Sequence, residues 1–282
     1  MTLTKIALKI GYDGAHFAGS QIQPDKRTIE GELLKALKEV GAIENEETAD
    51  LSFAGRTDAG VHSSNQVISF YTSNPRMALP RVLNSKLPND LWAWAYAEVA
   101  ADFDPRRHAV SRKYRYILSA DGYDISKMRE AAKLFIGEHN FLNFSKKDKK
   151  NQKSPVRNVE KLDIRSQGSV IRIDIEANSF LWNMIRKIVS SLILIGTGNR
   201  PIEWISQMLD PENYEEGIEP ASAYGLILVG VSYDPEPEWI ADGYSMRRIN
   251  DYYTKEANRF RVLSSVLDQF VMPAEKDKKR IE

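Results

Sequence analysis

Hydrophobic and polar positions along the chain follow two patterns, one typical of strands and one typical of helices. Short apolar or alternating runs predict strands at residues 5–12, 51–54, 66–71, 91–99, 113–118, 159–164, 170–176 and 226–233. Apolar residues spaced three and four apart predict helices at residues 28–40, 77–87, 125–136, 181–196 and 202–209. Thr28 precedes the first helix, where we expect it to act as the N-terminal cap.

The order of these elements predicts an α+β fold with helices packed on the faces of an antiparallel sheet. The second half of the chain repeats the succession of strand, helix and paired strands, although no sequence repeat proves a duplication. Near the C-terminus, apolar residues at helical spacing predict an amphipathic helix over residues 244–271, followed by a charged tail. That helix could cover the core, dock on a second subunit or contact RNA.

Composition sets wide limits on the class of protein. The chain has 282 residues, of which 42% are hydrophobic, so it can bury the core of one large domain or two small ones. Cysteine is absent and the four histidines show no HxxxH spacing, so we expect no disulfide and no metal site. No apolar run approaches the ~20 residues that span a membrane, and the start lacks a secretion signal. We therefore expect a cytoplasmic protein.

Basic and acidic residues balance in number, 39 of each, but not in position. Lys and Arg concentrate near residues 106–107, 112–115, 146–153 and 186–187, while acids cluster at 212–219. This segregation suits a molecule with one phosphate-facing side. The alternative is a set of solvated loops and helix faces, which is the better interpretation of the 146–153 run taken alone.

The segment from Gly55 to His62 is the strongest candidate for chemistry. Asp58 lies in a glycine-bounded turn between two predicted strands, and Arg56 precedes it by two residues. An Asp-x-Gly sequence by itself predicts only a turn. In an extended segment, however, residues i and i+2 point the same way, so Arg56 could keep the Asp58 carboxylate ionised. An ionised, oriented Asp can act as a nucleophile or a base.

Several ordered motifs resemble those of the TruA-type tRNA pseudouridine synthases, and together they cover about residues 4–234. They are Tyr12-Asp13-Gly14, the octapeptide GRTDAGVH at residues 55–62, Leu83-Asn84-Ser85 with Leu87-Pro88, FDPRRHAVSRKYRY at 103–116, Gly137-Glu138-His139, Ser154-Pro155-Val156-Arg157, Asn178-Ser179-Phe180, Met184-Ile185-Arg186 and Gly225-Leu226.

The resemblance implies two ferredoxin-like halves with a largely antiparallel sheet flanked by helices and a basic cleft between the halves. Residues 1–100 would form the half that carries Asp58, residues 101–234 the half that completes the cleft, and residues 235–282 a helical extension. It further implies an isomerase that converts uridine to pseudouridine at positions 38–40 of the anticodon stem-loop of tRNA, without a cofactor, as a homodimer. Isomerisation involves no redox change, so the lack of a glycine-rich phosphate loop or a thiol is consistent with it.

By the same resemblance, three residues would be catalytic. Asp58 would be the nucleophile, Tyr114 would stack on the target base and is a candidate to take its C5 proton, and Arg186 would pair with Asp58. Arg186 lies in an otherwise apolar helical stretch, so it needs either a partner or a route to solvent. Tyr114 and Tyr116 alternate on one strand, a pattern that is otherwise typical of a core.

Further residues are expected to bind the substrate. Arg56 would help to displace the target nucleotide and contact phosphate, while Arg106, Arg112 and Lys113 would contact the RNA backbone. Three positions depart from the family: Ser20 and Arg107 stand where an aromatic is usual, and His108 where a small polar residue is. Two other functions stay open, a related synthase with other RNA targets and a non-catalytic tRNA-binding chaperone.

Overall fold

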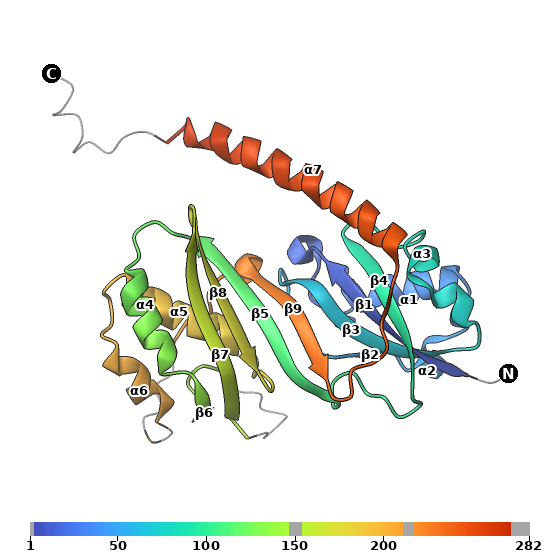
Figure 1. The fold of residues 1–282 in the computed structure, drawn as a ribbon, viewed down its shortest axis with the longest axis horizontal. Coiled ribbons are helices and arrows are strands. Elements are labelled where there is room, and N and C mark those ends of the chain that lie inside the picture. The colour runs from blue at the N-terminus through green and yellow to red at the C-terminus, as the bar shows by residue number, and fades with distance from the viewer. Residues whose placement is uncertain (1–2, 147–153, 211, 213–216, 272–282) are drawn as a thin grey trace.

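The protein is built around one large sheet. A computed structural model describes residues 3–146, 154–210, 212 and 217–271. Ten strands form the sheet in the order β10-β4-β1-β3-β9-β5-β8-β7-β6, with β2 paired to β3 beside this path. Figure 1 shows the helices in two groups, one at each end of the sheet, with α7 reaching across above it. The α+β class is confirmed.

The first half of the chain follows the order strand, helix, two strands, helix, strand. Its principal elements are β1 (Thr4–Tyr12), α1 (Ile29–Glu39), β2 (Ser52–Phe53), β3 (His62–Thr72), α3 (Pro80–Leu83) and β4 (Leu91–Val99), with a short α2 (Glu46–Ala49) before β2. In space the strands lie in the order β4-β1-β3-β2. The predicted cap is confirmed, because the Thr28 hydroxyl accepts from the backbone N–H of Gly31 at 3.2 Å.

The second half repeats this order, with one additional strand and one additional helix. Its elements are β5 (Ala109–Ser119), α4 (Ile125–Lys133), β6 (Gly137–Asn140), β7 (Val156–Gln167), β8 (Val170–Ala177), α5 (Met184–Gly196), α6 (Glu203–Leu209) and β9 (Leu226–Tyr233), of which β6 and α6 are the additional ones. The strands lie in the order β9-β5-β8-β7, which matches β4-β1-β3-β2 of the first half. Both halves therefore have the ferredoxin-like βαββαβ arrangement. The division at residues 100 and 234 stays a prediction.

The halves join where β3 meets β9. This pairing is parallel and short, with His62 opposite Ile227 and Ser63 opposite Leu228. The other strand pairs are antiparallel. The buried apolar residues form two clusters, one around Leu8 and Phe70 in the first half and the other around Phe135 and Ile173. The second cluster also includes Val61 and Val67 of the first half, so it continues across the seam. The two halves therefore share buried packing at the seam, where loops from both can meet.

Two predicted helices differ from the structure. Residues 77–87 were predicted as one helix, but they form a 3-10 turn at Pro75–Ala78 and the short α3. Pro80 explains the break, because proline has no N–H to donate and its ring clashes with the preceding turn. The helix predicted at 181–196 begins at Met184, since Asn183 has a positive φ of 63°. The short strands β6 and β10 (Ile240–Ala241) were not predicted.

The predicted C-terminal helix is confirmed as α7 (Gly243–Asp268). Its first turns pack on the first half: the Asn84 side chain donates to the Ser245 hydroxyl at 2.9 Å, and the rings of Trp92 and Tyr253 lie 4.7 Å apart. From residue 257 onward every described residue of α7 is exposed. Figure 1 shows this part of the helix extending away from the sheet. None of the described helices is long and apolar enough to cross a bilayer.

Candidate active site

The loop at residues 55–60 lies between β2 and β3, close to the seam of the two halves. The Gln66 side chain donates to the Gly55 carbonyl at 2.8 Å, and the Val61 N–H donates to the Asp58 carbonyl at 3.2 Å. Gly60 has a φ of 81°, a left-handed conformation that favours glycine. Both ends of the loop are thus held by hydrogen bonds, which leaves the Asp58 side chain partly exposed.

Asp58 forms an ion pair with Arg186 across the seam. The Arg186 Nη1 lies 3.3 Å from Asp58 Oδ2, and the two residues are 128 positions apart in sequence. The side chain of Asp58 is 35% exposed and that of Arg186 is 18% exposed. Arg186 also donates to the side chain of Asn183 at 3.2 Å. Among the described residues, the ion-pair partner of Asp58 is therefore Arg186 and not the sequence neighbour Arg56.

A segment just before β9 holds Arg186 in place, and sequence reasoning did not identify it. Arg186 Nε donates to the Ala221 carbonyl at 2.6 Å, and the Ala221 N–H donates back to the Arg186 carbonyl at 3.0 Å. The Tyr116 hydroxyl donates to the Ser222 carbonyl at 2.9 Å. Backbone carbonyls accept these hydrogen bonds, and every residue type has one. The sequence therefore does not identify this segment, apart from Pro220 and Gly225, which lie on either side of the turn.

Tyr114 lies on β5 next to the Asp58 loop. Its residue is only 8% exposed, and its ring meets that of Phe180 edge-on at 5.4 Å between centroids. Burial, with smaller contributions from Tyr12 and Asp58, raises the pKa of the Tyr114 phenol, so the group is neutral at ordinary pH. A neutral phenol can stack or donate a proton more readily than it can accept one.

Asp58, Tyr114 and Arg186 line one cavity of about 1360 Å³. This is larger than the ~300–1,000 Å³ that is usual for small-molecule pockets. Its walls come from both halves and include Trp182, which is 48% exposed. Of the described residues that line the cavity, Asp58 is the only acid, and the seven cations are Arg56, Arg106, Arg107, Arg112, Lys146, Arg157 and Arg186.

The predicted substrate-binding residues divide into two groups. Arg56 and Arg106 line the cavity and are exposed. Arg112 lines it too, but the residue is only 9% exposed and its two terminal nitrogens donate to the carbonyls of Ala54, Arg106, Ala109 and Asn178. This guanidinium is engaged in holding backbone together, so its placement favours a structural role over phosphate contact.

Lys113 is placed differently from its neighbours. It is not among the described residues that line the cavity, whereas Arg112 and Tyr114 are. Neighbouring residues of a strand point to opposite faces of the sheet, so Lys113 lies on the face away from the cavity. Lys113 was expected to contact the RNA backbone, and its place on the opposite face of β5 argues against contact with RNA bound in this cavity.

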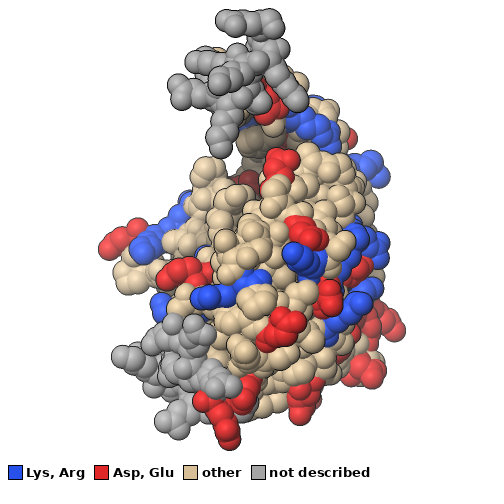
Figure 2. All heavy atoms as spheres, turned by 90° about the vertical axis from the view of Figure 1, so that its left-hand side faces the viewer, with Lys and Arg blue, Asp and Glu red and all other residues tan. Residues whose placement is uncertain are grey.

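The charge on the outer surface contrasts with that of the cavity. Figure 2 shows the end of the molecule where α4, α6 and β7 lie, and there Lys and Arg are intermingled with Asp and Glu. Residues 147–153 of the predicted basic run, and residues 213–216 of the predicted acidic cluster at 212–219, lie outside the described residues. Within the described part of the chain, no group of three or more His, Asp or Glu could hold a metal ion.

Comparison with known proteins decides the family. A family model described as tRNA pseudouridine synthase matches residues 131–234. The chain is 54% identical over 267 residues to "tRNA pseudouridine synthase A" of Methanosarcina mazei, a match that covers 95% of this chain and 98% of that protein. It is 47% identical over 266 residues to the protein of that name from Archaeoglobus fulgidus, covering 93% of this chain and 97% of that protein. The chain belongs to the tRNA pseudouridine synthase A family.

Members of this family are isomerases, so the enzyme class predicted from the sequence is confirmed. A distant likeness to a solved structure, "Crystal Structure of a Cbf5-Nop10-Gar1 Complex", has a TM-score of 0.35 at 14% identity and covers 82% of this chain and 59% of that one. The cavity of this pseudouridine synthase is lined by one carboxylate, by a guanidinium paired with it, and by aromatic side chains that include Tyr114.

Proposed function

We propose that this protein isomerises uridine to pseudouridine in the anticodon stem-loop of tRNA, at positions 38–40, with Asp58 as the nucleophile and without a cofactor. The observation that carries the proposal is the ion pair between Asp58 and Arg186 inside a cavity whose other charged side chains are cations. A negatively charged RNA is attracted to such a wall. The carboxylate of Asp58 is then the anionic group in the cavity wall that can react with the nucleoside.

The reaction needs little beyond an oriented carboxylate. The N1–C1′ bond breaks, the detached base turns, C5 joins C1′, and the proton of C5 is exchanged for one on N1. Asp58 can assist by attacking the sugar or the base, or by promoting elimination, and its anion is held toward the substrate by the 3.3 Å contact with Arg186. No electrons are gained or lost in the net change.

Tyr114 is proposed to stack on the target base after it leaves the RNA stack. Stacking on an aromatic ring contributes about 1–3 kcal/mol per base. The edge-on contact with Phe180 orients the ring, and the raised pKa of the phenol argues against its accepting the C5 proton. We therefore assign Tyr114 to holding the base and leave the proton acceptor unassigned.

Arg56 and Arg106 are proposed to contact phosphates, because both are exposed and both line the cavity. Contacts of this kind fix the position of the RNA without reading its sequence. Arg56 lies in the same loop as Asp58, so it is also placed to help displace the target nucleotide. Arg112 and Lys113 are not proposed to contact phosphate. Arg112 holds backbone carbonyls, and Lys113 lies on the other face of β5.

The experiment is to incubate the protein with an unmodified tRNA transcript that carries uridines inside and outside the anticodon arm, and to map pseudouridine at each position. Product confined to positions 38–40 is expected. Product at other positions would instead favour a related synthase with other targets. Tight binding without product at any position would overturn the enzymatic proposal and favour an RNA chaperone.

We also propose that the protein works as a homodimer, and α7 supports this. Phe260, Leu263 and Leu267 recur at spacings of three and four, so they share one face of the helix, and all are exposed. Apolar stripes of this kind mark contact surfaces. Sedimentation of the full chain is expected to give twice the monomer mass, and Phe260→Ser with Leu267→Ser is expected to shift it toward the monomer. A monomeric wild type would contradict the proposal.

A further inference from the structure

A second loop, formed by residues 13–28, lies directly against the loop that carries Asp58. An added Cβ at Gly14 would collide with the carbonyl of Val61, and one at Gly19 would lie 3.1 Å from the Thr57 carbonyl and 3.4 Å from the Ala59 nitrogen. Backbone meets backbone at both places, which only glycine permits. The conformation of the Asp58 loop is therefore set from outside as well as by its own turn.

The closest link between the two loops is formed by Ser20 and Thr57. The Thr57 N–H donates to the Ser20 hydroxyl oxygen at 2.9 Å, and the Ser20 N–H donates to the Thr57 carbonyl at 3.0 Å. Ser20 is 2% exposed and Thr57 is 7% exposed, so water does not easily replace these bonds. From the other side, the Tyr12 hydroxyl lies 2.9 Å from the Thr57 hydroxyl. Thr57 is thus fixed through both backbone groups and its side chain.

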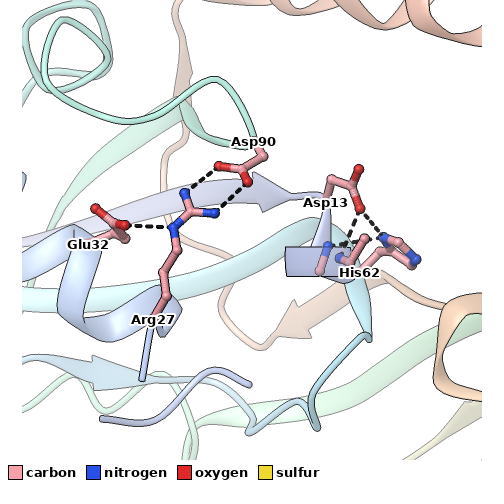
Figure 3. A network of polar contacts seen from close by, with 7 residues as sticks. Asp13, Arg27, Glu32, His62 and Asp90 are labelled. Carbon is pink, nitrogen blue, oxygen red and sulfur yellow. Dashed lines mark hydrogen bonds and ion pairs between the residues drawn. The ribbon is translucent and has the colours of Figure 1, made fainter. Parts of the chain in front are cut away.

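The loop at 13–28 is itself anchored at both ends, as Figure 3 shows. At one end the imidazole of His62 lies 2.9 Å from the Asp13 carboxylate. At the other, Arg27 makes two hydrogen bonds of 2.8 Å to Asp90 and one of 2.7 Å to Glu32. The Asp13 N–H donates to the Asp90 carbonyl, which links the two anchors. A loop held this way can transmit a fixed position to whatever it contacts.

We propose that Ser20 is a positioning residue for Asp58. It acts through Thr57, the residue immediately before Asp58, and sets the direction in which the Asp58 side chain points. The inference rests on the proposed role of Asp58 as the nucleophile. Small displacements of a reacting group reduce rates strongly, because catalysis depends on near-attack geometry.

The test compares Ser20→Ala and Ser20→Thr with Ser245→Ala. Ser245 is also 2% exposed and its hydroxyl also takes part in a hydrogen bond, but it lies on α7. With unmodified tRNA as substrate, Ser20→Ala is expected to lower kcat about tenfold while KM stays within about twofold, since the cations that bind RNA are untouched. Ser20→Thr keeps the hydroxyl and should recover most of the loss. Ser245→Ala should lower Tm without changing kcat.

Hydrogen exchange at the Thr57 amide provides a second measurement. In Ser20→Ala the protection of this amide is expected to fall relative to the wild type and to Ser245→Ala. An unchanged kcat in Ser20→Ala, a loss confined to KM, or an equal loss in Ser245→Ala would overturn the positioning role while leaving the proposed function intact. A wild type that forms no pseudouridine would overturn the proposed function, and the positioning role with it.

Discussion

The loop that carries Asp58 is held firmly by hydrogen bonds, whereas Arg106 and Arg107, which line the same cavity, are exposed to solvent. Thr57, next to Asp58, is buried and bonded on three sides, and Asp58 itself is paired with Arg186. Arg106 is exposed, and Arg107 has 86% of its side chain exposed. A reacting group must be in position before the substrate arrives, whereas phosphate contacts can form as the RNA settles. Substitutions in the two regions should therefore affect different kinetic constants.

The largest effect in this comparison is expected for Arg186→Ala. It removes the ion pair with Asp58 and the bond to the Ala221 carbonyl, so kcat should fall about 100-fold, with RNA binding little changed. Arg186→Lys should recover only part of the loss, because an ammonium cannot reproduce the fixed fork of a guanidinium. Single-turnover rates on tRNA measure this. An Arg186→Ala variant within threefold of the wild-type rate would show that the pair is not needed.

Two substitutions at Tyr114 distinguish the stacking of its ring from the chemistry of its hydroxyl. Tyr114→Ala removes the ring and should lower kcat/KM by roughly five- to 150-fold, the equivalent of one lost base stack. Tyr114→Phe keeps the ring and should lose clearly less, since the raised pKa keeps the hydroxyl protonated and a protonated phenol does not accept a proton. Steady-state kinetics of the two variants decide the matter. If Phe is as damaging as Ala, the hydroxyl and not the ring is what the reaction requires.

Arg106→Ala should weaken tRNA binding about three- to tenfold, leave kcat unchanged and reduce the salt dependence of binding by about one ion. Arg112→Ala is the matched arginine variant. It strips partners from four carbonyls, so it should lower the free energy of unfolding by about 3 kcal/mol, with Tm as the measurement. A normal Tm together with a reduced salt slope for Arg112→Ala would reverse our division of the two arginines.

The smallest effect is expected for Lys113→Ala. Because β5 directs this side chain away from the cavity, kcat, KM and the salt slope should all stay within about twofold of the wild-type values. Filter binding at several salt concentrations, alongside Arg106→Ala, provides the measurement. A loss equal to that of Arg106→Ala would place RNA on both faces of the sheet.

Local patterns predicted much of the fold and the centre of the site. Alternation and helical spacing located most strands and helices, and the Thr28 cap, because these depend on neighbours in sequence. The octapeptide pointed to Asp58. The prediction of one helix at 77–87 was wrong, because Pro80 interrupts the helix despite the helical spacing of the apolar residues. Arg112 and Lys113 looked equivalent in sequence, yet burial and strand alternation give them different surroundings.

The supports of the site had no local signal. Ala221 holds Arg186 through its backbone, which any residue type could supply, and Ser20 reaches Thr57 across 37 positions. Contacts of this kind appear only in the folded chain, and the pairing of Arg186 with Asp58 also requires the two halves to be joined. The sequence therefore indicated Asp58 as the candidate reacting residue. It did not indicate the residues that position Asp58.

The most direct test of the account is the rate of pseudouridine formation by Asp58→Asn on unmodified tRNA, measured together with tRNA affinity. Asn keeps the size of the side chain and removes the charge. We expect the rate to fall at least about 10³-fold, and affinity to stay within about threefold because phosphate contacts dominate binding. Asp102→Asn, at an exposed acid of the same type, should behave as the wild type. Substantial turnover by Asp58→Asn would contradict the account, because another group would then have to perform the reaction.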